Sequence, residues 1–276
     1  MNKICYVFAG ILLSLAIAQN NNTVTKSMIG SFNFTQASHD NWVQGGENVL
    51  SWFLDIKGDY KKESEKSIFQ GSGHANYGKT KISDTDARKS MDELKLDLLY
   101  TMKMGWTVNP YISAQLLSQL APGYAYSDTN KTQISAFMDP GYLIQTLGIG
   151  YSIDDKFAAR FGASVKESVS DQYPIPNAEN PDATPDKIRT EFGFQSEFDI
   201  KKQFGEKTVF ASEIDIFSNL EGLDLIDVIW DTNLNTKISE YLQFGFQYKI
   251  VYDKDVSKKR QIKSVLSLGL NYTFYK

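Results

Sequence analysis

The residues of this sequence that could do chemistry are charged side chains spaced by even numbers of positions. They are Lys95, Lys103, Arg160, Lys166, Glu191, Glu197, Asp199, Glu213, Asp215, Asp227 and Asp231. If these segments are β-strands, side chains an even number of positions apart point to the same face. The pattern then predicts a basic wall and an acidic wall that face each other. Such walls impose a transverse field on a water-filled pore, which orients polar solutes.

A second hypothesis gives the same residues a structural role. Opposite charges can pair across an interior and fill it, which leaves a nearly closed protein. The pairing depends on a shape that the residue pattern does not specify, so both hypotheses stay open here. The acidic residues could also hold a hard cation such as calcium, but no loop has an ordered ligand spacing. We therefore predict no metal site and no cofactor.

Side chains for covalent or metal-dependent catalysis are scarce. The chain has two histidines and one cysteine, which leaves little material for a zinc or haem site. His39 or His74 would have to supply any histidine base, and no nucleophile-elbow sequence accompanies the serines. We predict no catalytic residue and keep a hydrolase only as a minor alternative. A formal charge of -4 and an isoelectric point near 5.3 argue against nucleic-acid binding.

The elements that position these charges are predicted from a period-two alternation of apolar and polar residues. Leu266, Leu268 and Leu270, for example, alternate with Ser267 and Gly269, as in a strand with one apolar face. About twelve strands follow, near residues 29–38, 48–58, 66–77, 90–104, 109–121, 132–152, 156–169, 188–202, 207–218, 224–238, 240–252 and 261–275. We expect the sixth to bend at Asp139-Pro140-Gly141.

The first 18 residues are predicted to be a cleaved secretory signal peptide. Lys3 precedes an apolar run that is too short to span hydrocarbon as a helix, and Ala16-Ile17-Ala18 forms a small-x-small cleavage site. Residues 19–276 are then one domain. Cys5 lies in the leader, so the exported chain is expected to lack cysteine, as many bacterial envelope proteins do.

Two fold classes fit the alternation: a transmembrane β-barrel with apolar residues outside, and a soluble sandwich or lipocalin-like barrel with apolar residues inside. We favour an all-β, antiparallel, up-and-down transmembrane barrel. Twelve strands enclose an interior too wide for side chains alone to fill, and long polar connections alternate with tight ones. Aromatic residues near strand ends would form interfacial girdles. They are Tyr100, Trp106, Tyr111, Tyr151, Trp230, Tyr241, Tyr252, Tyr272 and Phe274. The chain also ends within a strand, although its terminal Lys276 departs from the usual final Phe.

The mean hydropathy of -0.33 would by itself suggest a soluble protein. A barrel needs apolar residues at only every second strand position, so its lumen and loops lower the average. The negative value is therefore compatible with a membrane barrel.

Several motifs resemble one uncharacterised family. The segment around Asn41-Trp42-Val43-Gln44-Gly45-Gly46 is similar to the N-terminal signature of domain of unknown function family 3078, from Gram-negative envelopes. Further likenesses are Asp92-Glu93-Leu94, Ile134-Ser135-Ala136-Phe137 and Leu147-Gly148-Ile149-Gly150-Tyr151. The resemblance implies an outer-membrane β-barrel and carries over no activity or substrate.

These observations lead us to expect an outer-membrane barrel, not an enzyme. The first hypothesis is a passive pore or transport-related barrel for small polar solutes, lined by the charged residues named above. The alternative is a structural or adhesive envelope barrel that acts through its long loops, above all 173–185. Expected partners are outer-membrane lipid and the barrel-assembly machinery, with no nucleic acid. The oligomeric state stays open.

Overall fold

The computed structural model of the chain describes residues 22–40, 43–44, 46–127, 130–173, 187–222, 226–253, 257 and 259–275. Several predictions concern residues outside these ranges: the signal peptide over residues 1–18, Asn41, Trp42, the terminal Lys276 and most of the 173–185 loop. The structure therefore does not test them.

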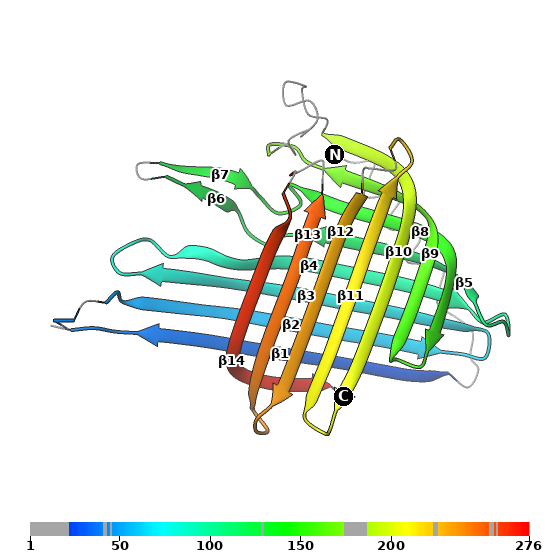
Figure 1. Cartoon of the computed structure of the whole chain (residues 1–276), viewed down its shortest axis with the longest axis horizontal. Helices are drawn as coiled ribbons and strands as arrows, with labels where there is room; N and C mark the ends of the chain where they lie inside the picture. Colours follow the sequence, from blue (N-terminus) through cyan, green and yellow to red (C-terminus); the bar gives the residue numbers. More distant parts are fainter. Residues whose placement is uncertain are drawn as a thin grey trace.

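Twelve antiparallel strands form a closed barrel, as the alternation predicts. They are β1 (Thr23–Ala37), β2 (Val49–Glu63), β3 (Ser67–Ile82), β4 (Arg88–Met102), β5 (Asn109–Ser118), β8 (Gly141–Ile153), β9 (Phe157–Val169), β10 (Ile188–Phe204), β11 (Thr208–Asn219), β12 (Ile226–Lys237), β13 (Leu242–Asp253) and β14 (Gln261–Tyr275). The first and last strands close the ring, with Ser31 opposite Asn271. Strands β1 to β4 cross the direction of β11 to β14 on the opposite wall (Figure 1), because barrel strands tilt against the barrel axis.

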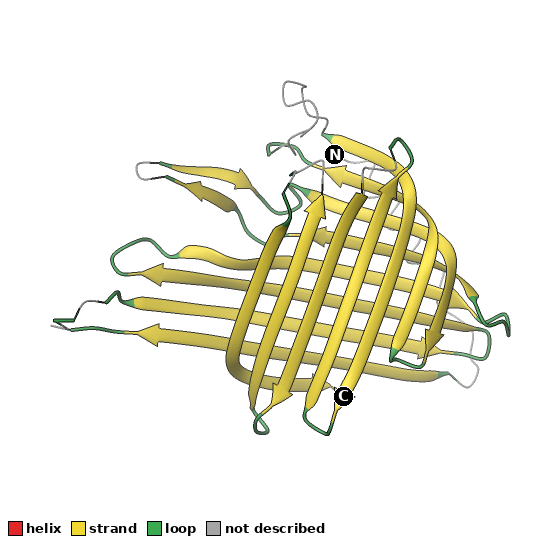
Figure 2. Cartoon of the chain, in the orientation of Figure 1, coloured by secondary structure: helices red, strands yellow, loops and turns green. Residues whose placement is uncertain are grey.

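The described residues form strands and loops only (Figure 2). No helix among them is long and apolar enough to cross a membrane.

The strand predicted over residues 132–152 is wrong as a single element. It divides into β7 (Lys131–Ser135), which pairs with β6 (Gly123–Tyr126) in a separate two-stranded sheet, and the barrel strand β8. The division falls at the predicted bend. The carboxylate of Asp139 accepts hydrogen bonds from the amides of Asp171 at 2.9 Å and Gln172 at 2.8 Å. Because these contacts hold residue 139 to the next long connection, the chain turns before β8 begins.

The connections at the two ends of the barrel differ, as predicted. Residues 64–66, 103–108, 154–156, 205–207 and 238–241 join strands at one end, where β1 also begins and β14 ends. The opposite end carries the connections 38–48, 83–87, 119–140, 170–187, 220–225 and 254–260. Bacterial outer-membrane barrels have this arrangement, with short turns and both termini on one side.

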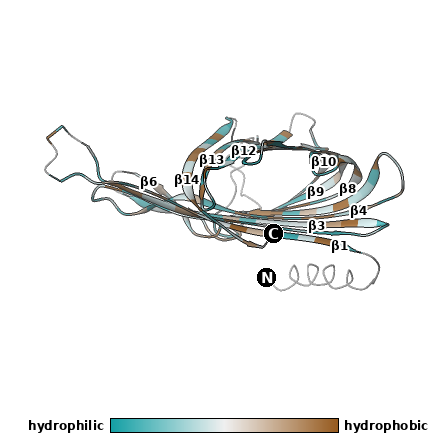
Figure 3. Ribbon diagram, turned by 90° about the horizontal axis from the view of Figure 1, so that it is seen from below, coloured by the Kyte–Doolittle hydropathy of each residue, from teal (hydrophilic) through white to brown (hydrophobic). Residues whose placement is uncertain are grey.

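Apolar side chains lie on the outside of the barrel and polar ones on the inside. Leu266 is 71% exposed and Leu147 is 65% exposed, whereas Gln195 and Thr146 are 2% exposed. The buried hydrophobic side chains among the described residues are only Met91, Tyr111, Ile144 and Phe217. A soluble barrel would have the opposite distribution, because water drives apolar surface inward. Figure 3 shows the two walls in cross-section, closed into a flattened oval.

Tyr111 is a correction to the predicted outer aromatic residues. Its side chain is 2% exposed and lies inside, whereas Trp106, Tyr241, Tyr272 and Phe274 are each more than half exposed. Tyr111 is four positions from the buried Gln115 on β5, so the two share a face of the strand. The position of Tyr111 near a strand end is typical of an interfacial girdle. Whether a residue occupies an odd or an even position along the strand, however, decides which face of the barrel wall it occupies.

Leu268→Lys tests the apolar outer face. Leu268 lies at the middle of β14 and is 55% exposed. In lipid, a lysine there should lower the free energy of unfolding by about 2–4 kcal/mol if it lies at the bilayer midplane. Denaturant unfolding of the barrel in phosphatidylcholine vesicles measures the change.

The matched control is Gln247→Lys on the inner face of β13, where the Gln247 amide already donates to Asp231 at 2.9 Å. A lysine there gains that carboxylate as a partner, so the control should remain close to wild type. Equal stability of both variants in lipid would contradict an apolar outer face.

Candidate functional site

The charged residues predicted to line the interior lie on the inner face of the barrel strands, with one exception. Lys103 follows the end of β4, and its Nζ donates to Glu63 Oε1 at 2.5 Å and to the carbonyl of Ser64 at 3.0 Å. It therefore lies at the rim at the short-turn end, one residue beyond β4 and not within the predicted strand, and its pore-lining role stays a prediction. Counting alternate positions correctly assigns Lys103 to the same face as Lys95. The alternation does not show where the strand ends.

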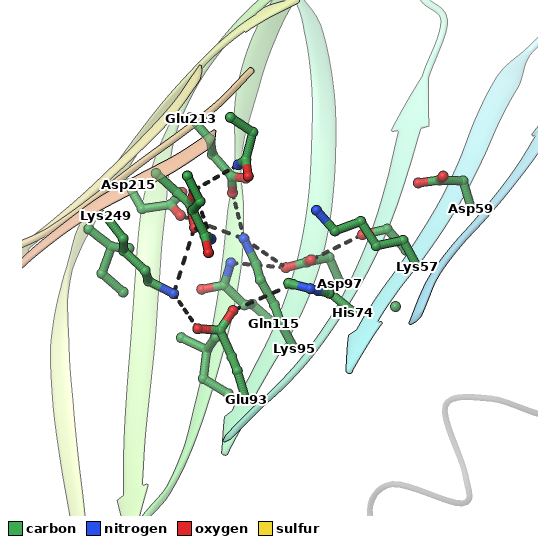
Figure 4. A pocket seen from close by; sticks show the side chains of 17 residues that line it. Lys57, Asp59, His74, Glu93, Lys95, Asp97, Gln115, Glu213, Asp215 and Lys249 are labelled. Carbon is green, nitrogen blue, oxygen red and sulfur yellow. Dashed lines mark hydrogen bonds and ion pairs between the residues drawn. The ribbon is translucent and has the colours of Figure 1, made fainter. Parts of the chain in front are cut away.

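Lys95 of β4 bridges the lumen. Its Nζ lies 2.6 Å from Glu213 Oε1 on β11, and these strands are not neighbours in the barrel. The same ammonium lies 3.8 Å from Asp97 Oδ1 and 3.9 Å from Asp215 Oδ2. Figure 4 shows these side chains converging from opposite walls. One lysine thus joins the two walls and faces three carboxylates.

A second bridge runs from β13 to β4. Lys249 Nζ lies 2.7 Å from Glu93 Oε2 and 3.9 Å from Asp231 Oδ2. His74 of β3 extends this cluster, with Nε2 at 2.8 Å from Asp55 and Nδ1 at 3.5 Å from Glu93. Together the two bridges hold the flattened walls at a fixed separation.

The second bridge consists of residues that the sequence prediction missed. Glu93 shares the inward face with Lys95, and Lys249 belongs to the polar face of its strand. Parity could therefore have placed both in the lumen. Their pairing could not be predicted, because residues 93 and 249 meet only through the way the two walls oppose each other.

A third cluster centres on Lys166 of β9, which is only 4% exposed. Its Nζ pairs with Asp227 of β12 and lies 3.6 Å from both Glu191 and Asp253. An ammonium this deeply buried needs carboxylate partners, because the desolvation of a lone charge costs several kcal/mol. These contacts join β9 to strands three and four places along the same part of the ring, in addition to the neighbouring β10.

Arg160 forms a fourth cluster within one wall. Its Nε lies 2.5 Å from Glu197 Oε2, and its Nη2 contacts Asp199 on the same neighbouring strand, β10. Of the two arrangements left open by the sequence, the structure has the one in which the charges pair. The basic and acidic walls do not face each other across an open gap.

A cavity of roughly 190 Å³ lies between the first two bridges. Its charged lining consists of six carboxylates, three lysines and His74. Figure 4 shows His74, Lys95, Gln115, Asp215 and Lys249 around it. No group of three or more His, Cys, Asp or Glu among the described residues is arranged to hold a metal ion. The cavity can hold water or a small polar ligand.

His74 has no arrangement for nucleophilic catalysis in the described part of the chain. Both of its ring nitrogens face carboxylates, and the nearby Ser72 hydroxyl donates to Asp97 at 3.0 Å. A serine nucleophile would need a hydrogen bond to a histidine base. The geometry therefore gives His74 the role of a structural link in the ion-pair network.

The rim at the opposite end has its own polar contacts. The carboxylate of Asp171 accepts a hydrogen bond from Lys187 and raises the pKa of this lysine. With the Asp139 contacts described above, this pair ties the ends of the β9–β10 connection to the barrel.

The comparisons with known proteins agree with the predicted resemblance. The model of a family described as "Protein of unknown function (DUF3078)" matches residues 34–124. No curated protein matches the chain.

Solved structures with a similar arrangement include the translocator domain of the autotransporter NalP from Neisseria meningitidis. It is 9% identical, with 98% of this chain and 94% of that chain covered at a TM-score of 0.40. The COG4313 outer membrane channel from Pseudomonas putida F1 is 11% identical, with coverage of 94% and 97% at a TM-score of 0.39. The outer membrane channel DcaP of Acinetobacter baumannii is 8% identical, with coverage of 94% and 100% at a TM-score of 0.33.

Lys166→Met tests whether the lumen charges act as paired groups. The substitution leaves Asp227, Glu191 and Asp253 without the central ammonium. It should lower the free energy of unfolding by about 3–5 kcal/mol, as expected when one partner of a buried pair is removed. Denaturant unfolding at neutral pH in vesicles gives the value.

Lys156→Met is the control, because this lysine lies in the exposed β8–β9 turn, 3.5 Å from Asp154. It should change the unfolding free energy by less than about 1 kcal/mol. A Lys166→Met barrel as stable as this control would show that the buried cluster does not need its cation.

Proposed function

We propose that this chain is an outer-membrane barrel with a narrow polar lumen that admits small polar solutes, and that the ion-pair bridges form its constriction. The observation that carries the proposal is the distribution of side chains, with leucines exposed outside and charged groups buried inside. Such a barrel satisfies its backbone hydrogen bonds within lipid and keeps a hydrophilic path inside.

The bridges favour a restricted pore over a wide one. Lys95 to Glu213 and Lys249 to Glu93 cross the lumen on both sides of the cavity. A solute must pass between these side chains or displace them. Conductance should therefore be low, and the surplus of carboxylates around the cavity should favour cations.

The location and partners follow from the same proposal. A chain exported through the predicted leader would reach the outer membrane, where the barrel-assembly machinery inserts such proteins. Its outer apolar face would contact lipid. The paired state of His74 supports a role other than catalysis.

Lys95→Ala/Lys249→Ala tests the constriction. Removing both bridging side chains should raise single-channel conductance in a planar bilayer roughly twofold or more, because the narrowest section loses its two crossing groups. The preference for cations should also increase, since the carboxylates lose their partners. Glu213→Gln/Asp215→Asn should change the preference in the opposite direction.

Lys156→Ala, in the exposed turn, is the control and should conduct like wild type. Heat-modifiable gel mobility confirms that each variant is folded. If the folded wild type and the widened variant are both silent, the pore proposal is wrong.

The β6–β7 sheet favours a second candidate function, an envelope barrel that acts by surface contact. This hairpin extends beyond the barrel wall at the long-loop end (Figure 1). Lys131 Nζ lies 4.2 Å from the ring centre of Tyr124, and Arg88 Cζ lies 4.3 Å from that of Tyr126. Ile134 and Phe137 are more than half exposed beside it. Aromatic residues and arginine are enriched in protein contact surfaces.

Replacing residues 123–134 with a short glycine–serine linker tests this candidate. The base of the connection keeps its contacts, because Asp92 accepts hydrogen bonds from the amides of Leu120 and Ala121. The barrel should therefore fold and conduct as before, while attachment of expressing cells to a surface should fall sharply if the hairpin mediates it. Unchanged attachment would rule out this hairpin as the contact element.

A further inference from the structure

Two lysines lie on the outward face of β3 near the long-loop end of the barrel. Lys79 and Lys81 share that face with Tyr77, because residues two positions apart on a strand point to the same side. His74, an odd number of positions away, points into the lumen instead. Tyr77 packs edge-on against Trp52 of β2, with the ring centres 6.0 Å apart, and Trp52 is opposite Lys79 in the strand register. Aromatic rings and then ammonium groups therefore follow one another toward the rim.

Neither ammonium group has a carboxylate partner in the described part of the chain. The Nζ of Lys79 lies 6.0 Å from the ring centre of Tyr77. The carboxylate of Asp92, which is opposite Tyr77 on β4, is already paired with Lys89 at 2.7 Å. Lys79 and Lys81 therefore offer two positive charges to an anion outside the barrel wall.

An apolar groove lies on the same outer surface, farther from the rim. It has a volume of roughly 430 Å³ and lies over β1 to β4. Gly58 and Gly73 are opposite each other on β2 and β3 and form its floor, whereas Ile56, Leu94 and Leu96 line its sides. Ile56 and Leu96 are exposed on the outer surface. The groove therefore opens toward lipid, and a hydrocarbon chain held in it gains dispersion contacts with these side chains.

The spacing between the groove and the lysines matches one membrane leaflet. Gly73 precedes Lys79 by six residues on β3, which corresponds to about 20 Å along a strand. At a typical barrel tilt this is about 15 Å along the membrane normal, half of the hydrocarbon thickness. A single lipid can therefore place a phosphate at the lysines and an acyl chain in the groove.

We infer that this outer face binds a phosphorylated, acylated glycolipid of the lipid A type, with a phosphate at Lys79 and Lys81 and an acyl chain in the groove. Phosphate oxygens accept charge-assisted hydrogen bonds from ammonium groups. The long-loop end of outer-membrane barrels faces the outside of the cell, and lipids of this type form the outer leaflet there. A free phosphate ion would leave the groove empty, and a neutral lipid would leave the lysines without a partner.

Native mass spectrometry of the folded, detergent-solubilised barrel, titrated with purified lipids, tests the site. The wild type should bind one diphosphorylated lipid A saturably, at least about tenfold more tightly than dephosphorylated lipid A or phosphatidylglycerol. Phosphatidylglycerol carries one phosphate and two acyl chains, so it separates this glycolipid from anionic lipids in general. Equal or absent binding of the three lipids by the folded wild type would overturn the inference.

Lys79→Gln/Lys81→Gln tests the phosphate contact. The double substitution should weaken lipid A binding about tenfold or more, because the phosphate loses two cations. The matched control is Lys62→Gln/Lys202→Gln, which removes the same charge near the short-turn ends of β2 and β10 and should leave binding unchanged. Full binding by the folded Lys79→Gln/Lys81→Gln variant would overturn the inference.

Gly73→Leu tests the groove. A Cβ at this position meets Leu96 Cδ2 at 3.4 Å, which is ordinary contact with a flexible side chain, so the strand tolerates the substitution. The leucine fills the floor of the groove and should weaken lipid A binding several-fold, because the acyl chain loses its dispersion contacts. Ala163→Leu, at an exposed position of β9, is the control and should bind like wild type. Unchanged binding by the folded Gly73→Leu variant would also contradict the inference.

This inference rests on the outer-membrane location in the proposed function and does not require a solute to pass. Heat-modifiable gel mobility confirms that each variant is folded, and the wild-type comparison of the three lipids decides the question if a variant is not. Conductance is measured separately. Lipid A binding by a folded barrel that never conducts would support the lipid site and reject the pore, whereas conductance without a preference for lipid A would reject the lipid site alone.

Discussion

Strand alternation in a closed ring is the constraint on which the rest of this structure depends. Because β1 pairs with β14, every barrel strand has a neighbour on both sides, and successive side chains must point either outward or into the lumen. Most leucines and phenylalanines of the strands occupy the outward positions, and Phe217 is an exception that lies inside. The charged residues of the strands therefore share a confined interior, where a charge without a partner is costly.

Ion pairs between strands inside the barrel give these confined charges their partners. Lys95, Lys249 and Lys166 each contact a carboxylate from a strand that is not their neighbour. The contacts of Lys95 and Lys249 join the two facing walls of the oval barrel, whose cross-section Figure 3 shows. The bridges stabilise the flattened shape, and they also leave a small cavity between them, with Asp215 and Gln115 at its edge. The same side chains thus serve stability and define what the lumen can admit.

The sequence predicted the fold well, because a period of two is a local property. The outward position of Leu268 and the inward position of Lys166 both follow from counting residues along a strand. Strand ends are harder to predict, because the alternation of apolar and polar residues can continue beyond the last residue of a strand. Lys103 therefore lies in a turn, and residues 132–152 divide into β7 and β8. Tyr111 was placed outside on residue type, although its spacing from Gln115 puts it inside. The cross-lumen pairs depend on the tilt of the strands and on the flattening of the barrel. Neither property produces a pattern in a short stretch of sequence.

The most direct test of an apolar outer face and a polar lumen is a spin-label scan of residues 265–270 on β14 in lipid vesicles. The sole cysteine of the chain is Cys5, in the predicted leader, so a single cysteine can be introduced at each position. Accessibility to oxygen, which concentrates in lipid, should peak at positions 266, 268 and 270 and fall at 265, 267 and 269. A polar relaxation reagent reaching all six positions equally, without a period of two, would contradict the membrane barrel.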